Sequence, residues 1–126
     1  MPRNIKSGLI QMSLPMTEGE GTITEIMDAM VQKHIPLIED AGKQGVQILC
    51  LQEIFNTPYF CPGQDNAWYA SAEAVPGPTT ELMQDYAKKY NMVIIVPIYE
   101  KEQAGVLYNT AAVSYTHLTL PTILLV

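Results

Sequence analysis

The chain has little positive charge, little cysteine and no long hydrophobic run. Its 126 residues include 7 basic and 13 acidic side chains, which give a formal net charge of −6. This balance disfavours a surface for nucleic acid or for an anionic membrane. No apolar run approaches the roughly 20 residues that span a bilayer, and the polar residues 2–7 do not resemble a signal peptide. We therefore expect a cytoplasmic protein with neither a nucleic-acid nor a membrane partner.

Cysteine and histidine are too sparse to predict a metal centre. The two cysteines, Cys50 and Cys61, form neither a disulfide framework nor a metal-ligand spacing, so we expect reduced thiols and no metal or cofactor. His34 lies on an apolar helical stripe, and no carboxylate or cysteine accompanies it at metal spacing. A partly buried structural histidine is therefore favoured over an acid, a base or a ligand.

The composition, 48% hydrophobic and 16% charged, is that of one globular domain. Short continuous apolar runs, typical of buried strands in a parallel sheet, alternate with apolar stripes at helical spacing. The expected strands are residues 5–12, 46–51, 92–99 and 106–113, and the expected helices are residues 23–41 and 78–90. The resulting order, β-α-β-α-β-β, predicts an α/β fold with a mostly parallel sheet and a final antiparallel pair.

The first helix carries a clear start signal and an internal interruption. Thr22 and Glu25 have the T-x-x-E spacing of a capping box, which predicts that the helix begins at Ile23. Pro36 falls within the apolar stripe and lacks a backbone N–H. We therefore expect a kink or a break near residues 33–35.

The stretch at residues 47–55 organises the chain, because it places a carboxylate at the end of a buried strand. Glu53 follows the apolar run 46–51, and ligands of open α/β sheets bind outside the carboxyl ends of the strands. The apolar neighbours Ile54 and Phe55 favour a carboxylate that accepts a proton near neutral pH. We therefore predict that Glu53 is a general base.

A long irregular segment, residues 56–76, follows this carboxylate. Loops of this length in a compact domain are usually functional, and aromatic side chains can form the walls of a small-molecule pocket. The candidate pocket residues are Phe55, Tyr59, Phe60 and Trp68. A short helix at residues 66–73 that only packs against the domain is the alternative. The two interpretations stay open for Phe60 and Trp68, whereas packing is favoured for Tyr69.

Four segments resemble the nitrilase, or carbon–nitrogen hydrolase, superfamily. They are the strand at 8–12, the stretch 48–55 with Gln52-Glu53, the run 76–80 and the segment Tyr108-Asn109-Thr110-Ala111. The run 51–55 with Tyr59-Phe60-Cys61 is most similar to the branch of β-ureidopropionase and N-carbamoylputrescine amidohydrolase, which hydrolyse N-carbamoyl amines. The resemblance covers residues 3–113 and implies the amino-terminal part of a nitrilase-type αββα sandwich.

The resemblance also implies a cysteine–glutamate–lysine mechanism in which Glu53 is the general base. In this mechanism the cysteine attacks the carbonyl carbon of an N-carbamoyl amine or amide, and the lysine stabilises the developing oxyanion. The family's lysine and cysteine lie beyond the strand that residues 108–113 match, and neither occurs before Val126. The residues Cys50, Cys61, Lys101 and His117 lack the family context and receive neither role. The family relationship further implies a homo-oligomeric parent protein.

Residues 114–126 depart from the family pattern. This segment is uncharged apart from His117 and ends in Ile-Leu-Leu-Val. It resembles translated sequencing-adaptor DNA, so we expect a truncated hydrolase domain at 1–113 and a non-native tail at 114–126. A divergent native end that forms a short edge strand is the alternative. Truncation would uncover a sheet face and forgo on the order of 10 kcal/mol, so we expect an inactive and poorly soluble chain.

A small α/β ligand-binding module without catalysis is the competing function. In that interpretation the loop 56–76 is a lid over the ligand. No glycine-rich phosphate loop follows any of the expected strands, so the sequence offers no anchor for a nucleotide.

Overall fold

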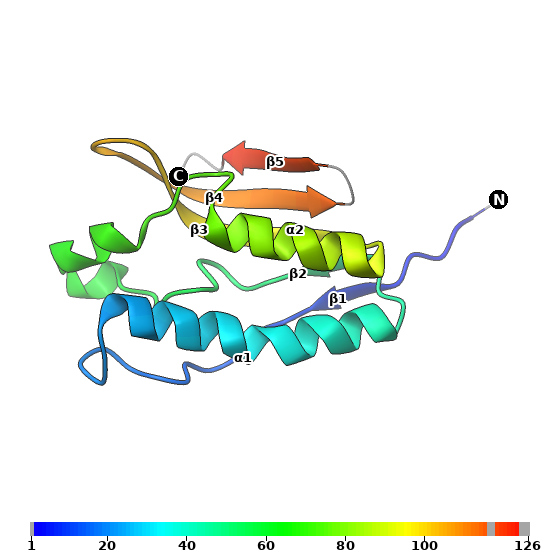
Figure 1. The fold of residues 1–126 in the computed structure, drawn as a ribbon, viewed down its shortest axis with the longest axis horizontal. Coiled ribbons are helices and arrows are strands. Elements are labelled where there is room, and N and C mark those ends of the chain that lie inside the picture. The colour runs from blue at the N-terminus through cyan, green and yellow to red at the C-terminus, as the bar shows by residue number, and fades with distance from the viewer. Residues whose placement is uncertain (1, 116–117, 124–126) are drawn as a thin grey trace.

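Five strands form one mixed sheet (Figure 1). The computed structural model describes residues 2–115 and, for the backbone only, residues 118–123. The strands are β1 (Ser7–Leu9), β2 (Ile48–Cys50), β3 (Val93–Gln103), β4 (Val106–Tyr115) and β5 (Leu118–Ile123). They lie in sequence order across the sheet. β1, β2 and β3 run parallel to one another, β4 is antiparallel to β3, and β5 is antiparallel to β4. The predicted α/β fold is confirmed, with β5 as an additional strand.

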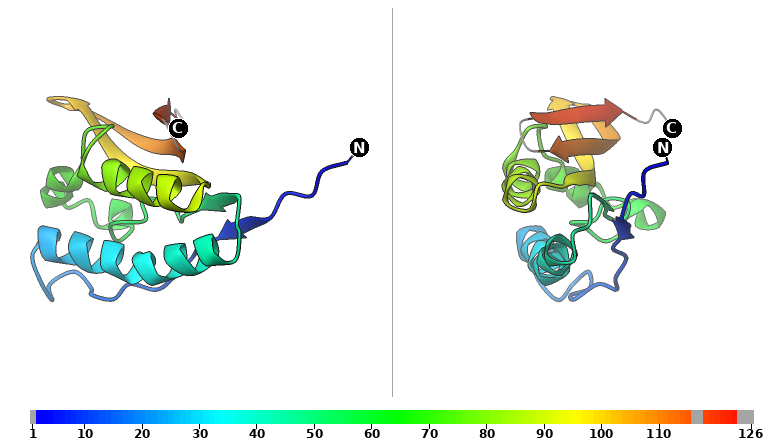
Figure 2. Two further views of the ribbon diagram at one scale, coloured as in Figure 1. Left: turned by 45° about the vertical axis from the view of Figure 1, so that its right-hand side comes forward. Right: turned by 90° about the vertical axis from the view of Figure 1, so that its right-hand side faces the viewer.

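Both α-helices, α1 (Ile23–Lys43) and α2 (Pro78–Tyr90), lie on the same face of the sheet (Figure 2). Parallel strands need crossover connections, and each helix supplies one of them. Two 3-10 helices, η1 (Cys61–Gly63) and η2 (Asn66–Ser71), interrupt the connection between β2 and α2. The core lies between the helices and the sheet and includes Ile38, Leu49, Met83, Ile94 and Val96. None of the helices in the described part of the chain combines the length and the apolar character needed to cross a bilayer.

Helix α1 begins at Ile23, as predicted. It continues through residues 33–35, where a kink or a break was expected. Thr22 Oγ1 accepts the Glu25 N–H at 3.2 Å, and Glu25 Oε2 accepts the Thr22 N–H at 2.7 Å, which completes the capping box. The helix then runs without a break through Pro36 to Lys43. Its buried stripe consists of Ile26, Met30, His34 and Ile38. Burial of this stripe offsets the one backbone hydrogen bond that proline cannot donate.

The first two strands are shorter than predicted, because a side chain replaces the backbone ladder at their ends. Ile10 N still donates to Cys50 O at 3.0 Å, just beyond β1. Two residues later, Met12 N donates to Gln52 Oε1 at 2.7 Å instead of to the backbone. The Gln52 side chain therefore separates the segment after β1 from the segment after β2, directly before Glu53.

The status of residues 114–126 remains a prediction. Residues 116–117, which include His117, and residues 124–126 lie outside the described residues. Ser114 and Tyr115 end β4, and β5 pairs with β4 in an antiparallel register.

Candidate active site

Glu53 lies on an arch at the carboxyl end of β2. Leu51 N donates to Ile95 O at 3.1 Å. Phe55 N donates to Pro97 O, also at 3.1 Å. Leu51 and Phe55 are four positions apart in the chain, whereas their acceptors on β3 are only two apart. The surplus residues therefore bulge out of the ladder, as in a β-bulge, and Glu53 lies at the centre of this arch.

The arch contains an unusual backbone conformation next to Glu53. Ile54 has a φ of 38°, in the left-handed region that β-branched residues avoid. Its side chain is buried, and its carbonyl oxygen accepts the Thr57 N–H at 3.0 Å. Such strain persists only where the surroundings fix it, and it is concentrated at functional sites.

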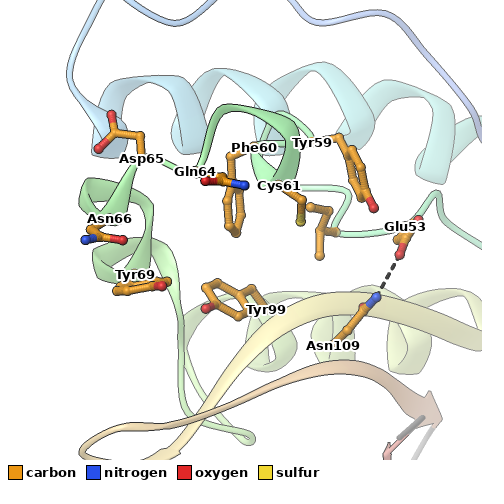
Figure 3. Close-up of a pocket in the computed structure, with 11 residues that line it drawn as sticks. Glu53, Tyr59, Phe60, Cys61, Gln64, Asp65, Asn66, Tyr69, Tyr99 and Asn109 are labelled. Atoms are coloured by element: carbon orange, nitrogen blue, oxygen red, sulfur yellow. Dashed lines mark hydrogen bonds between the residues drawn. The ribbon is translucent and has the colours of Figure 1, made fainter. Parts of the chain in front are cut away.

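A pocket of about 640 Å³ opens beside the arch (Figure 3). This volume is in the range of small-molecule sites. Its walls are largely aromatic, and its polar groups include two carboxylates and three side-chain amides, with no lysine, arginine or histidine among the lining residues. The lining residues are Glu53, Ile54, Tyr59, Phe60, Cys61, Gln64, Asp65, Asn66, Tyr69, Tyr99 and Asn109.

Two of the four aromatic candidates line this pocket with Glu53, and two do not. Tyr59 and Phe60 are lining residues. Phe55, in contrast, is fully buried, because the chain rejoins the β3 ladder at this residue and its ring packs edge-on against His34 at 4.9 Å. Trp68 is also buried and stacks against Phe60 with ring centroids 5.6 Å apart. Phe55 therefore does not line the pocket, contrary to the expectation. For Trp68, the structure agrees with the packing alternative that the sequence left open, and its ring supports a pocket wall from behind.

The expectation for Tyr69 also needs correction. Tyr69 was expected to pack, but it is 55% exposed and lines the pocket, because only part of η2 faces the core. Both cysteines are free thiols: Cys61 is exposed and lines the same pocket, whereas Cys50 is half-buried. The neighbouring Cys61 thiol and, to a lesser degree, the Glu53 carboxylate raise the pKa of the Tyr59 hydroxyl.

Asn109 is one of the pocket residues that sequence reasoning did not assign to the site. It lies on β4 directly opposite Tyr99 in the register. Its Nδ2 donates to Glu53 Oε1 at 2.7 Å, which joins residues 56 positions apart (Figure 3). The only sequence signal was its place in a segment that resembles the family. This side-chain contact between β4 and the arch is a tertiary feature that no local sequence pattern predicts.

His34 is fully buried instead of partly buried. Its ring donates from Nδ1 to Met30 O at 2.7 Å and is absent from the pocket lining. Burial is the main reason why the pKa of His34 is lowered; the nearby charge of Lys33 lowers it further, and the bond to Met30 opposes the shift. Within the described residues, no group of three or more histidine, cysteine or acidic side chains could hold a metal ion.

The fold and the pocket define an α/β protein with a carboxylate at the carboxyl end of the parallel strands of a mixed sheet, in an aromatic-walled pocket of small-molecule size. The carbon-nitrogen hydrolase family profile matches residues 9–114. The chain belongs to the carbon–nitrogen hydrolase family.

Similar proteins include a beta-ureidopropionase and an omega-amidase. The chain is 40% identical over 116 residues to the beta-ureidopropionase of Arabidopsis thaliana, with 89% of this chain and 28% of the relative covered. It is 35% identical over 94 residues to the omega-amidase NIT2 of Bos taurus, with 72% of this chain and 32% of the relative covered. The chain thus spans about a third of the length of these curated relatives.

A solved structure supports the fold assignment. The carbon-nitrogen hydrolase of Helicobacter pylori G27 superposes with a TM-score of 0.74 at 19% identity. The match covers 94% of this chain and 39% of that chain. The described architecture therefore corresponds to part of the carbon–nitrogen hydrolase fold.

Proposed function

We propose that this chain supplies the general-base part of an enzyme that hydrolyses a non-peptide C–N bond in an N-carbamoyl amine or an amide. The observation that carries the proposal is the position of Glu53, on a strained arch at the carboxyl end of β2 and in a pocket of substrate size. Membership of the carbon–nitrogen hydrolase family and similarity to a beta-ureidopropionase and an omega-amidase support the reaction class.

The proposed chemistry uses Glu53 twice. In the first half, Glu53 accepts the proton of a cysteine thiol while sulfur attacks the carbonyl carbon; the proton then leaves with the departing nitrogen. In the second half, Glu53 takes a proton from water, whose oxygen forms a bond to the carbonyl carbon while the bond from that carbon to sulfur breaks. Glu53 then returns the proton to the departing sulfur, which restores the thiol and the free carboxylate. A lysine stabilises the negative charge on the carbonyl oxygen in both halves. The cysteine and the lysine belong to the whole enzyme, and Glu53 is the member that this chain contributes.

The pocket also contains a thiol that does not have the proposed role. Cys61 lines the pocket with Glu53, yet its surroundings do not match the family's nucleophile. We therefore expect the isolated chain to release no ammonia from N-carbamoyl-β-alanine, N-carbamoylputrescine or an ω-amide. Turnover by the isolated chain that Cys61→Ser abolishes would refute this assignment and would make Cys61 the nucleophile.

A hybrid enzyme tests the proposal directly. Residues 9–114 of this chain replace the matching segment of the Arabidopsis thaliana relative, which supplies the rest of the enzyme. The hybrid is expected to release ammonia from at least one of the three substrates, and Glu53→Gln should abolish release without changing the melting temperature appreciably. Glutamine keeps the size of glutamate and removes the base. Full activity in Glu53→Gln would show that Glu53 is structural.

The alternative, a ligand-binding module without catalysis, predicts a different result. The pocket would then bind an N-carbamoyl amine or an amide without turnover. In the isolated chain, binding measured by calorimetry together with an inactive hybrid would favour this alternative.

A further inference from the structure

We infer that Asn109 is a positioning residue for Glu53: its side-chain amide holds one carboxylate oxygen so that the other is free to take a proton in the pocket. The inference rests on the proposed function, because it assigns Asn109 a task only if Glu53 is the base. It adds a residue from a second element, β4, to a site that the sequence had located on one strand end.

The hydrogen bond has the geometry of a strong, oriented contact. The separation of 2.7 Å between Asn109 Nδ2 and Glu53 Oε1 is in the range of charge-assisted hydrogen bonds. An ionised carboxylate can only accept, so the nitrogen of the amide and not its oxygen must face Glu53. In the part of the chain that the structure describes, this is the only hydrogen bond to the Glu53 carboxylate. The second oxygen therefore remains available as the proton acceptor.

Glu53 needs such a contact because of where it lies. Its side chain is exposed on an arch that bulges out of the ladder, between the anchors at Leu51 and Phe55. An exposed glutamate can occupy many rotamers, and only those that aim an oxygen at the reacting group are productive. The buried Ile54 fixes the backbone of the arch but leaves the side chain of its neighbour free. A donor from outside the arch is required to select one rotamer.

Asn109 is suited to this task because two contacts fix its position: its backbone pairs with β3, and the residue that follows it is anchored on the opposite face of the sheet. It pairs with Tyr99 in the β3–β4 register, so its backbone belongs to a continuous ladder. The next residue, Thr110, is fully buried on the opposite face, and its hydroxyl donates to the Glu100 carboxylate. The donor is thus carried by a rigid strand and the base by a bulge, as expected for a preorganised site.

The test uses the hybrid enzyme described above and two substitutions at one position. Asn109→Leu removes the donor with little change in size, and Asn109→Asp removes it and places a second negative charge beside Glu53. We expect kcat to fall about tenfold or more in both variants while KM changes less than about threefold, because the lost contact orients the base and does not bind substrate. Asn109→Asp should be the slower of the two.

A stability control separates positioning from a structural role. Thr22→Ala removes the cap of α1, far from the pocket, and should lower the melting temperature while keeping kcat within about twofold. Retention of kcat within about twofold in Asn109→Leu, or an equal loss of kcat in Thr22→Ala at a matched loss of melting temperature, would overturn the inference.

A second measurement keeps the inference testable if the hybrid itself is inactive, a result that would count against the proposed function. In the intact chain, the side-chain amide resonances of Asn109 are followed by NMR as the pH is lowered and the carboxylates are protonated. The chemical shifts of these amide resonances should change with pH in the wild-type chain and stay constant in Glu53→Gln. Equal movement in both chains would show that the amide does not hold Glu53, whatever the reaction.

Discussion

His34 shows how one residue can make stability depend on pH. Its ring is fully buried on α1 against Phe55, and Nδ1 is bonded to Met30 O. Within the described residues, Nε2 has no hydrogen-bond partner. A buried nitrogen without a partner is unfavourable, and a proton added there would bring an unpaired charge into the core. This is the physical reason for the lowered pKa of His34.

Replacing His34 with leucine is expected to remove this pH dependence. The unfolded histidine binds a proton at pH values near 6.5, whereas the folded one does so only at lower pH, so the wild-type chain loses stability as the pH falls below about 6.5. At pH 7.5, His34→Leu should have a free energy of unfolding within about 1 kcal/mol of that of the wild-type chain. At pH 5.5, the variant should be more stable relative to the wild-type chain than it is at pH 7.5. Urea titrations at both values measure this. A parallel decline in the two proteins would contradict the prediction.

At the scale of one element, α1 depends on its cap. Thr22 and Glu25 satisfy two N–H groups at the start of the helix. Thr22→Ala is expected to lower the free energy of unfolding by about 1 kcal/mol, whereas Thr22→Ser keeps the hydroxyl and should lower it much less. Urea unfolding followed by circular dichroism measures both variants. Equal losses would show that the hydroxyl contributes nothing and that only side-chain packing matters.

The arch between β2 and β3 is an element that serves the site directly. Gln52 ends the β1–β2 ladder on one side, through its bond to Met12 N, and Phe55 restores the contact with β3 on the other. Between them the backbone is free to project Glu53 into the pocket. The arch therefore converts the regular end of a parallel strand into a platform for a single carboxylate.

At the scale of the whole molecule, the sheet has one face that the helices cover and one face that is open within residues 2–115. The helices lie on one side of the sheet (Figure 2). Leu49 and Ile94 belong to the covered face, because both are fully buried in the core that includes Ile38 of α1 and Met83 of α2. The register places an apolar row across the other face, formed by Leu9, Cys50, Ile95 and Val113. Leu9 is 85% exposed in this row. An apolar surface of this kind favours association between molecules.

Leu9→Lys is expected to reduce self-association without destabilising the fold. The side chain is already in solvent, so the free energy of unfolding should change by less than about 0.5 kcal/mol, while light scattering at high concentration should fall. Leu14→Lys is the matched control, because Leu14 is an exposed leucine in the loop before α1. Equal effects of the two variants would show that added charge, and not the open face, controls association.

Hydrophobic periodicity and capping residues, both local features of the sequence, were sufficient to predict several parts of the fold. The order of strands and helices and the start of α1 at the Thr22 cap follow from periodicity and capping, which act over a few residues. The place of Glu53 at the end of a parallel strand follows from the same reasoning. The family resemblance then indicated a chemical role for that carboxylate, which remains a proposal.

Tertiary structure alone decided the remainder, because it depends on contacts between distant segments. Burial of the α1 stripe keeps the helix unbroken at Pro36, against the local preference of proline. The return of the chain to β3 buries Phe55, and the packing of η2 buries Trp68 while exposing Tyr69. The bond from Asn109 to Glu53 joins β4 to the arch. The sequence by itself determined the order of β1 to β4 and of the two α-helices and the place of the carboxylate after β2. Long-range packing determined which side chains surround that carboxylate, because those contacts join segments far apart in the chain.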